Sequence, residues 1–150
     1  MIFKNRNKIF SIFKPLSKCK IIMNQEKNKK LILIVEDDIF VTDIYQTKFE
    51  KEGYAIVAAE NGLEAMKKLE GGLKPDLILL DIIMPYLDGL SVLKKINENE
   101  EWKKIPVVLL SNLSQKEEIQ KGFSLGVKDY IIKSHFTPSE VLEKINKFLK

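Results

Sequence analysis

The sequence predicts a single α/β domain with a parallel sheet, and two features of residues 31–150 support this. Short apolar runs alternate with segments whose apolar residues recur at helical spacing, which is typical of α/β folds. The runs are rich in Val and Ile and do not alternate with polar residues, as expected for strands buried on both faces. A chain of 150 residues, 45% of them hydrophobic, is long enough for one such core.

Five strands and five helices are expected, without internal repeats. The strands are expected at residues 31–35, 54–59, 77–80, 107–110 and 130–132. The apolar faces of the helices are expected at residues 39–49, 63–69, 90–96, 119–123 and 141–149. Gly53 is a helix stop, and Pro138 suits a first helical turn. Ser114 and Glu117 have the spacing of a capping box for the fourth helix.

Four of the expected strands end at polar residues of different kinds. Glu36-Asp37-Asp38 follow the first strand, Asp81 the third, Ser111 the fourth and Lys133 the fifth. Because parallel strands end at the same edge of a sheet, these side chains are expected to converge. Open α/β sheets bind ligands in the crevice at that edge. The pattern therefore predicts a site.

The grouped carboxylates predict a cation site with a nucleophile beside it. Crowded carboxylates repel each other, so such a cluster either takes up protons or binds a cation, and oxygen ligands suit Mg²⁺. Asp81 stands alone on its strand, in the middle of the group, and is a candidate nucleophile toward phosphorus. Lys133 would neutralise charge on the transferred group, and Ser111 would donate a hydrogen bond to it. The product would be an aspartyl phosphate.

Each of these residues also has a simpler interpretation when it is taken alone. A single acidic residue after a strand is usually a turn former or a helix cap, and Asp38 fits that role. A serine in this place is often an N-cap, and a lone lysine is usually a solvated charge. His135 has no second His or Cys at ligand spacing, so it is interpreted as a surface residue. The coincidence at four strand ends favours the site.

The basic character of the chain belongs to its first thirty residues. Residues 1–30 contain nine Lys or Arg and one Glu, a net charge of +8, whereas residues 31–150 contain sixteen basic and twenty acidic residues, a net of −4. The apolar residues between Ile9 and Leu16 fit a short basic amphipathic helix on anionic lipid or nucleic acid. The alternatives are a disordered tail, or sequence upstream of a true start at Met23. We favour these two, and expect a basic leader over residues 1–30 and one domain over residues 31–150.

The cysteine content and hydropathy indicate the compartment. Cys19 is the single cysteine, so no intramolecular disulfide is possible and a reducing, cytoplasmic location is expected. No apolar stretch approaches the roughly 18 residues of a membrane span. We therefore expect a cytoplasmic protein without a membrane span.

Four ordered motifs resemble the receiver domains of two-component response regulators, the CheY-like family. They are Leu-Ile-Val-Glu36-Asp37-Asp38, Asp81-Ile-Ile-Met-Pro-Tyr-Leu-Asp88-Gly89, Leu-Leu-Ser111, and Gly126-Val-Lys-Asp-Tyr130-Ile-Ile-Lys133. The similarity covers about residues 31–150. It implies a flavodoxin-like doubly wound sheet of five parallel strands in the order 2-1-3-4-5, with helices on both faces.

The resemblance also implies a role for the charged residues at the strand ends. Asp81 resembles the phosphate acceptor of the family, and Lys133 resembles the partner of the phosphoryl oxygens. Glu36 and Asp37 resemble the acidic pair that organises Mg²⁺. By this resemblance Asp37 would ligate the ion directly and Glu36 through water, and the backbone carbonyl of Ile83 would supply another ligand.

The remaining site residues resemble the switch of the family. Ser111 resembles the hydroxyl that moves toward the phosphoryl group, and Tyr130 matches the aromatic that then turns inward. Phosphorylation would be transmitted to the face formed by the fourth helix, the fifth strand and the fifth helix.

Three features depart from the family pattern. Ser134 stands where a proline in a cis peptide commonly follows the lysine. A cis bond without proline costs about 2.5–4 kcal/mol, so either the peptide is trans or the fold compensates for that cost. Asn112 is bulkier than the usual Ala or Gly and is expected to narrow access to the site. Ile83 and Leu113 are apolar and unable to orient an attacking water, so slow self-dephosphorylation is expected.

The pattern as a whole predicts a stand-alone receiver rather than an enzyme. We expect phosphorylation on Asp81 by a histidine kinase or phosphotransfer protein, and signalling to another protein. Because the chain ends at Lys150, just past the fifth helix, no output module and no direct DNA binding are expected. A monomer or a weak phosphorylation-dependent dimer is expected.

Two other functions are compatible with parts of the pattern. One is a phosphate-independent interaction module with the same fold. The other is a phosphatase of the haloacid dehalogenase type, but its Asp-x-Asp motif is matched neither by Glu36-Asp37-Asp38 nor by Asp81-Ile-Ile.

Overall fold

Five parallel strands form the centre of the molecule. The computed structural model describes residues 28–150, and the expectations for residues 1–27 lie outside the described part. The strands are β1 (Leu31–Val35), β2 (Ala55–Ala59), β3 (Leu77–Leu80), β4 (Val107–Ser111) and β5 (Asp129–Ile132). They pair in the order β2-β1-β3-β4-β5, every pair parallel, which confirms the expected topology. The order reverses direction between β1 and β3, and open sheets bind ligands at such a point.

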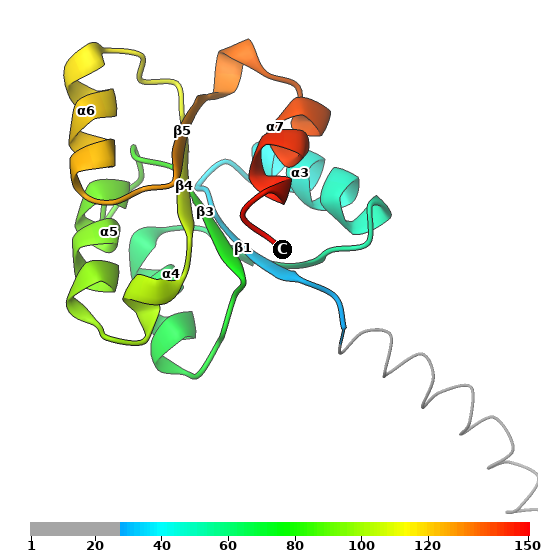
Figure 1. Cartoon of the computed structure of the whole chain (residues 1–150), viewed down its shortest axis with the longest axis horizontal. Helices are drawn as coiled ribbons and strands as arrows, with labels where there is room; N and C mark the ends of the chain where they lie inside the picture. The colour runs from blue at the N-terminus through cyan, green and yellow to red at the C-terminus, as the bar shows by residue number, and fades with distance from the viewer. Residues whose placement is uncertain (1–27) are drawn as a thin grey trace, which may run out of the picture.

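Helices cover both faces of the sheet (Figure 1). They are α3 (Ile39–Lys51), α4 (Gly62–Glu70), α5 (Gly89–Glu98), α6 (Lys116–Ser124) and α7 (Pro138–Asn146), with short 3-10 helices η1 (Trp102–Lys104) and η2 (Lys133–His135). The α3 and α7 helices pack on one face, and α4, α5 and α6 on the other. Within residues 28–150 no helix combines the length and apolarity that crossing a membrane requires.

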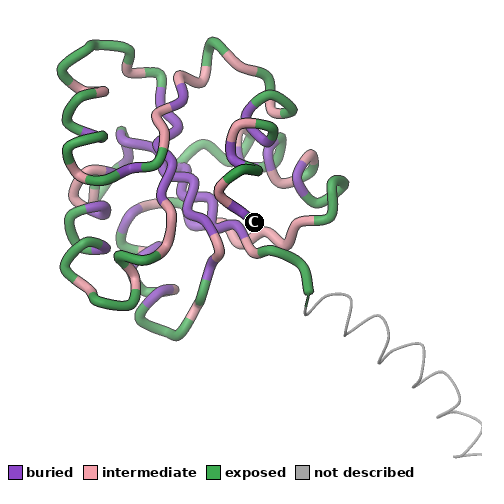
Figure 2. Tube along the Cα trace, viewed as in Figure 1, coloured by how far each residue is buried: buried purple, intermediate pink, exposed green. Residues whose placement is uncertain are grey.

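The sheet divides the core into two layers because successive side chains of a strand point to opposite faces. Leu33, Ile78 and Leu109 pack toward α4 and α5, whereas Ile32 and Leu79 pack toward α3 and α7. The three central strands are buried almost throughout, and the edge strands β2 and β5 are half-buried (Figure 2). Central burial on both faces explains the unbroken apolar runs at β1, β3 and β4.

The start of α6 differs from the sequence prediction. The expected capping box at Ser114 is absent, because the helix begins at Lys116 and Gln115 occupies the N-cap without a side-chain hydrogen bond. The hydroxyl of Tyr130 donates to the carbonyl oxygen of Leu113 at 2.7 Å. This contact joins the loop before α6 to β5. A complete capping box forms instead at α7, between Thr137 and Glu140.

The buried face of α3 is narrower than the sequence predicts. Thr42, Tyr45 and Phe49 are its buried residues. Ile39 and Ile44, which were expected on the same face, are 55% and 56% exposed. Because the helix repeats every 3.6 residues, the stripe from 42 to 49 faces the sheet and leaves these two side chains outside it.

Candidate functional site

Three carboxylates converge at the ends of β1 and β3. Glu36 and Asp81 are buried, with 4% and 7% of their surface exposed, whereas Asp37 is exposed. The backbone amide of Glu36 donates a hydrogen bond to the carbonyl oxygen of Ala59 at 3.0 Å, and the amide of Asp81 donates one to the carbonyl oxygen of Val35 at 3.0 Å. The hydrogen bonds of the sheet therefore fix the backbone of both residues. Carboxylate oxygens of the three residues lie within 4.8 Å of one another. Such a set of oxygen ligands fits a small hard cation such as Mg²⁺.

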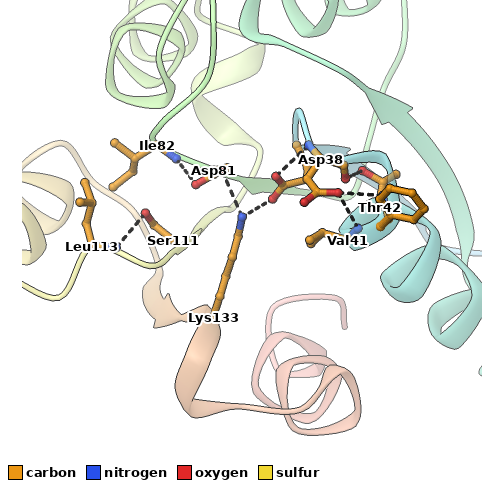
Figure 3. A network of polar contacts seen from close by, with 10 residues as sticks. Asp38, Val41, Thr42, Asp81, Ile82, Ser111, Leu113 and Lys133 are labelled. Atoms are coloured by element: carbon orange, nitrogen blue, oxygen red, sulfur yellow. Dashed lines mark hydrogen bonds and ion pairs between the residues drawn. The ribbon is translucent and has the colours of Figure 1, made fainter.

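Lys133 joins the two buried carboxylates (Figure 3). Its ammonium group contacts Glu36 and lies 3.1 Å from Oδ2 of Asp81. The lysine is the first residue of η2, immediately after β5, and its side chain extends toward the ends of β1 and β3. Residues 97 and 52 positions apart in sequence are thus brought together. The expected convergence of the strand-end charges is present.

Burial and charge act in opposite directions on these groups. Burial raises the pKa of Asp81, although Lys133 acts to lower it. Burial likewise raises the pKa of Glu36, against the hydrogen bond from Lys133. Burial would lower the pKa of Lys133, but its contacts with Glu36 and Asp81 raise it overall. The lysine therefore stays charged. A further cation would stabilise the ionised form of the two carboxylates.

Asp38 does not join the carboxylate cluster. Its side chain accepts hydrogen bonds from the amides of Phe40 and Val41 at 2.9 and 3.3 Å and forms the N-cap of α3. This confirms the simpler interpretation of the third acidic residue, because a side-chain oxygen satisfies free amides of the first turn. Its backbone amide donates to Glu36 Oε1 at 3.2 Å, which helps to orient that carboxylate.

Gly89 has a structural role at the site that the sequence analysis missed. Its amide donates to the carbonyl oxygen of Ile82 at 2.8 Å. A Cβ added at Gly89 would lie 2.0 Å from the carbonyl oxygen of Asp81, a distance that no side chain tolerates. In the same loop, the amide of Ile82 donates a hydrogen bond to Asp81 Oδ1 at 2.7 Å. Glycine is required at this position because α5 begins against the backbone of Asp81, which the Asp88-Gly89 motif by itself did not show.

Ser111 and Tyr130 are connected through the loop after β4. Ser111 is 1% exposed, and its hydroxyl accepts a hydrogen bond from the amide of Leu113 at 3.3 Å. Tyr130 is partly buried, and its hydroxyl donates to the carbonyl of the same leucine. Burial raises the pKa of Tyr130, while the nearby hydroxyl of Ser111 acts to lower it. The two predicted switch residues therefore share one backbone segment.

The positions that depart from the family pattern lie around the site opening. Ile83 is 62% exposed two residues after Asp81, and the role of its carbonyl as a ligand stays a prediction. Residues 28–150 contain no cis peptide bond, so the Lys133–Ser134 peptide is trans. Asn112 and Ser134 border a largely apolar cavity of about 390 Å³ beside Lys133. His135 is exposed, as interpreted from sequence.

Tyr45 is a second residue whose place the sequence did not show. It lies on α3, lines the same cavity as Lys133 and is 6% exposed. Burial raises the pKa of its hydroxyl, and the charges of Lys133 and Glu36 act on it in opposite directions. The only sequence signal was an aromatic at a core position of the helix.

Comparison with known proteins agrees with the geometry. Residues 32–146 match the family described as response regulator receiver domain. The chain is 36% identical over 123 residues to the alkaline phosphatase synthesis transcriptional regulatory protein PhoP of Bacillus subtilis, and 37% identical over 126 residues to the transcriptional regulatory protein ResD of that species. These matches cover 82% and 83% of this chain but 49% and 50% of the relatives. The chain thus spans about half the length of these curated relatives.

Solved structures give the same result. The Francisella response regulator 1452 receiver domain is 31% identical with a TM-score of 0.74, over 81% of this chain and 97% of that one. The response regulator TrrA from Thermotoga maritima, in complex with Mg²⁺ and BeF, is 35% identical with a TM-score of 0.70, over 80% and 99%. The chain belongs to the response regulator receiver domain family.

Proposed function

We propose that this receiver is a switch in which Asp81 accepts a phosphoryl group from a histidine kinase or a phosphotransfer protein. Receivers are signalling modules of two-component systems, and the family accounts for phosphorylation-based signalling. The observation that carries the assignment to Asp81 is its place between a cation and two further carboxylates at one edge of the sheet. Among residues 28–150, this cluster is the one grouping of three acidic residues close enough to share a metal ion.

The chain's own residues support a transfer step in which Asp81 is the nucleophile. An oxygen of Asp81 forms a bond to phosphorus as the bond from phosphorus to the donor nitrogen breaks. The amide of Ile82 holds Oδ1 and Lys133 holds Oδ2 at 3.1 Å, which orients the carboxylate before the donor arrives. Lys133 then offsets the negative charge of the transferred group.

Glu36, Asp37 and Asp81 would hold Mg²⁺. Their oxygens fit a hard cation, and receivers of this family bind Mg²⁺ at an acidic pocket. When bound, the ion neutralises charge on the phosphoryl oxygens. Asp37 is the exposed member of the set, so it is the ligand most open to exchange with solvent.

Transmission of the signal would start at the hydroxyl groups of Ser111 and Tyr130. The hydroxyl of Ser111 would turn toward the phosphoryl group, and Tyr130 would follow because both contact Leu113. The affected surface is formed by α6, β5 and α7, and we propose that it binds a downstream protein. The net charge of −4 over residues 31–150 is unfavourable for contact with DNA phosphates. We further propose that the protein acts in the cytoplasm, as a monomer or a weak phosphorylation-dependent dimer.

Acetyl phosphate and beryllofluoride, each with Mg²⁺, test the proposal. The expected results are a mass increase of one phosphoryl group with acetyl phosphate, and shifted amide signals around Ser111 and Tyr130 with either reagent. Asp81→Asn should abolish both, whereas Asp43→Asn, which removes an exposed carboxylate on α3, should abolish neither. No response of the unmodified protein to either reagent would contradict the switch and favour a phosphate-independent interaction module.

A further inference from the structure

An exposed apolar surface lies along α3, next to the carboxylate site. Phe40 is 74% exposed, and Ile39 and Ile44 are both more than half exposed. Ile44 also lines the cavity of about 390 Å³ that continues across to Phe136 and Pro138. We call the surface formed by Phe40, by Ile44 one helical turn later and by this cavity the α3 groove. Figure 2 shows the outer side of α3 as exposed.

Acidic side chains border the α3 groove on two sides. Asp37 precedes α3 and Asp43 lies on it, next to Ile44. Neither forms an ion pair with another residue between 28 and 150. Glu140 and Glu143 of α7 are exposed beside Phe136, where Lys144 lies 4.5 Å from the aromatic ring. An apolar groove with unpaired carboxylates along α3 is complementary to an apolar segment with basic residues.

Residues 1–22 of this chain have that composition. They contain six Lys or Arg and no Asp or Glu. Their apolar residues recur at helical spacing, at positions 9, 10, 12, 13 and 16. We propose that this segment binds the α3 groove of its own domain, with the apolar side chains on Phe40 and Ile44 and the basic side chains toward Asp43.

The chain is long enough for this contact within one molecule. The carbonyl of Lys30 accepts a hydrogen bond from Ala55 at 2.9 Å, so the described chain begins beside β2, the edge strand near which α3 packs. Residue 28 lies twelve positions after Leu16, a stretch that reaches about 40 Å when extended. The five residues of β1 rise about 17 Å and the thirteen of α3 about 20 Å. The apolar segment therefore reaches the groove without strain.

The single cysteine allows a direct test on the full 150-residue chain. Cys19 lies three residues after Leu16, so a nitroxide label on it reports where the segment lies. In ¹⁵N-labelled protein we expect the label to broaden amide signals of residues 39–44 and 134–136. Signals of α5, on the other face of the sheet, should be unchanged. Broadening that is absent, or equal on both faces, would overturn the proposal.

Two variants and a mixing experiment separate this contact from others. Ile44→Asp should remove the broadening, whereas Leu63→Asp, at a residue on α4 that is 47% exposed, should leave it. Equal loss in both variants counts against a specific groove. Broadening of unlabelled chains mixed with spin-labelled ones would assign the contact to a second copy and refute the intramolecular form. Another outcome is that the spin label leaves the signals of residues 39–44 unchanged, while anionic vesicles broaden the signals of residues 1–22. That outcome would refute the contact and identify a membrane-binding segment instead.

Discussion

The two halves of the site differ in how firmly the backbone holds them. The carboxylate half comprises residues 36–38 and 81–89, and each of its loops leads directly into a helix capped by an aspartate. Asp38 caps α3, and Asp88 caps α5 through the amide and hydroxyl of Ser91. Partial burial acts to raise the pKa of Asp88, but these hydrogen bonds lower it overall, as expected for an ionised cap.

The switch half, residues 111–116 and 130–135, has fewer constraints. Its helix α6 begins without a side-chain cap, and the hydroxyls of Ser111 and Tyr130 attach to the loop only through the backbone of Leu113. A binding site requires fixed ligands, whereas a signalling element requires two arrangements of similar energy. The comparison suggests that the carboxylate half keeps its geometry and that the switch half moves.

The largest expected effect comes from a methyl group added at a glycine of the carboxylate half, compared with one added on α6 next to the switch half. Gly89→Ala would put Cβ against the carbonyl of Asp81, so the backbone of the carboxylate half must move. We expect a loss of about 3–5 kcal/mol in the free energy of unfolding. Gly122→Ala on α6 brings Cβ to 2.7 Å from a methyl group of Leu109, a side chain that is able to shift, and should cost less than about 1.5 kcal/mol. Urea denaturation measures both, and equal losses would contradict the comparison.

Lys133→Met should give the next largest effect, because it removes the cation that joins the two halves. Glu36 and Asp81 would remain buried without a cationic partner, at a cost of about 2–3 kcal/mol at pH 8. Burial raises the pKa of both carboxyl groups above their unfolded values, so the folded variant takes up protons first as the pH falls. Its stability should therefore rise relative to the unmodified protein between pH 8 and pH 5.5. A difference independent of pH would refute this explanation.

Changes at the helix caps should have smaller and opposite effects in the two halves. Asp38→Ala removes two hydrogen bonds to the first turn of α3 and should cost about 1 kcal/mol. Gln115→Asp introduces a capping side chain at the uncapped start of α6, where the backbone is already extended, and should gain about 0.5–1 kcal/mol. Thermal unfolding at constant pH compares the two. A loss of stability in Gln115→Asp would contradict the interpretation that the start of α6 lacks a favourable cap.

The smallest expected effect concerns the lifetime of the proposed aspartyl phosphate. Ile83 is exposed at the edge of the carboxylate half and has no group that orients water. Ile83→Asn should accelerate dephosphorylation a few-fold, which corresponds to about 1 kcal/mol or less in the barrier. Loss of the phosphoryl group is followed by intact mass, with Leu63→Asn on α4 as the control. A lifetime of seconds in the unmodified protein, unchanged by Ile83→Asn, would contradict the expectation of slow turnover.

Local sequence was sufficient for most of the fold and for the charged residues of the site. The apolar runs of β1, β3 and β4 locate the central strands, because burial on both faces leaves no polar position in them. The polar residues after these runs then meet because parallel strands end at one edge. For the same reason Glu36, Asp81 and Lys133 were expected together and are found in contact.

The remaining features depend on contacts between distant segments. Three acidic residues follow β1 with equal local chemistry, and only the position of α3 makes Asp38 a cap and leaves Asp37 beside Asp81. The Ser114 box satisfies a local rule but does not form, because α6 begins at Lys116, one residue later than the box requires. Gly89 is necessary because α5 begins against the strand-end backbone of Asp81.

The sequence by itself therefore determined the strands, their order by family resemblance, and which charges meet at the sheet edge. The tertiary structure decided which carboxylate caps a helix, which apolar side chains of α3 stay exposed, and how Ser111 and Tyr130 are connected. The physical reason is range: strand burial and helix periodicity act between near neighbours in sequence. Caps, close backbone approaches and exposed faces are selected by packing against elements that lie far along the chain.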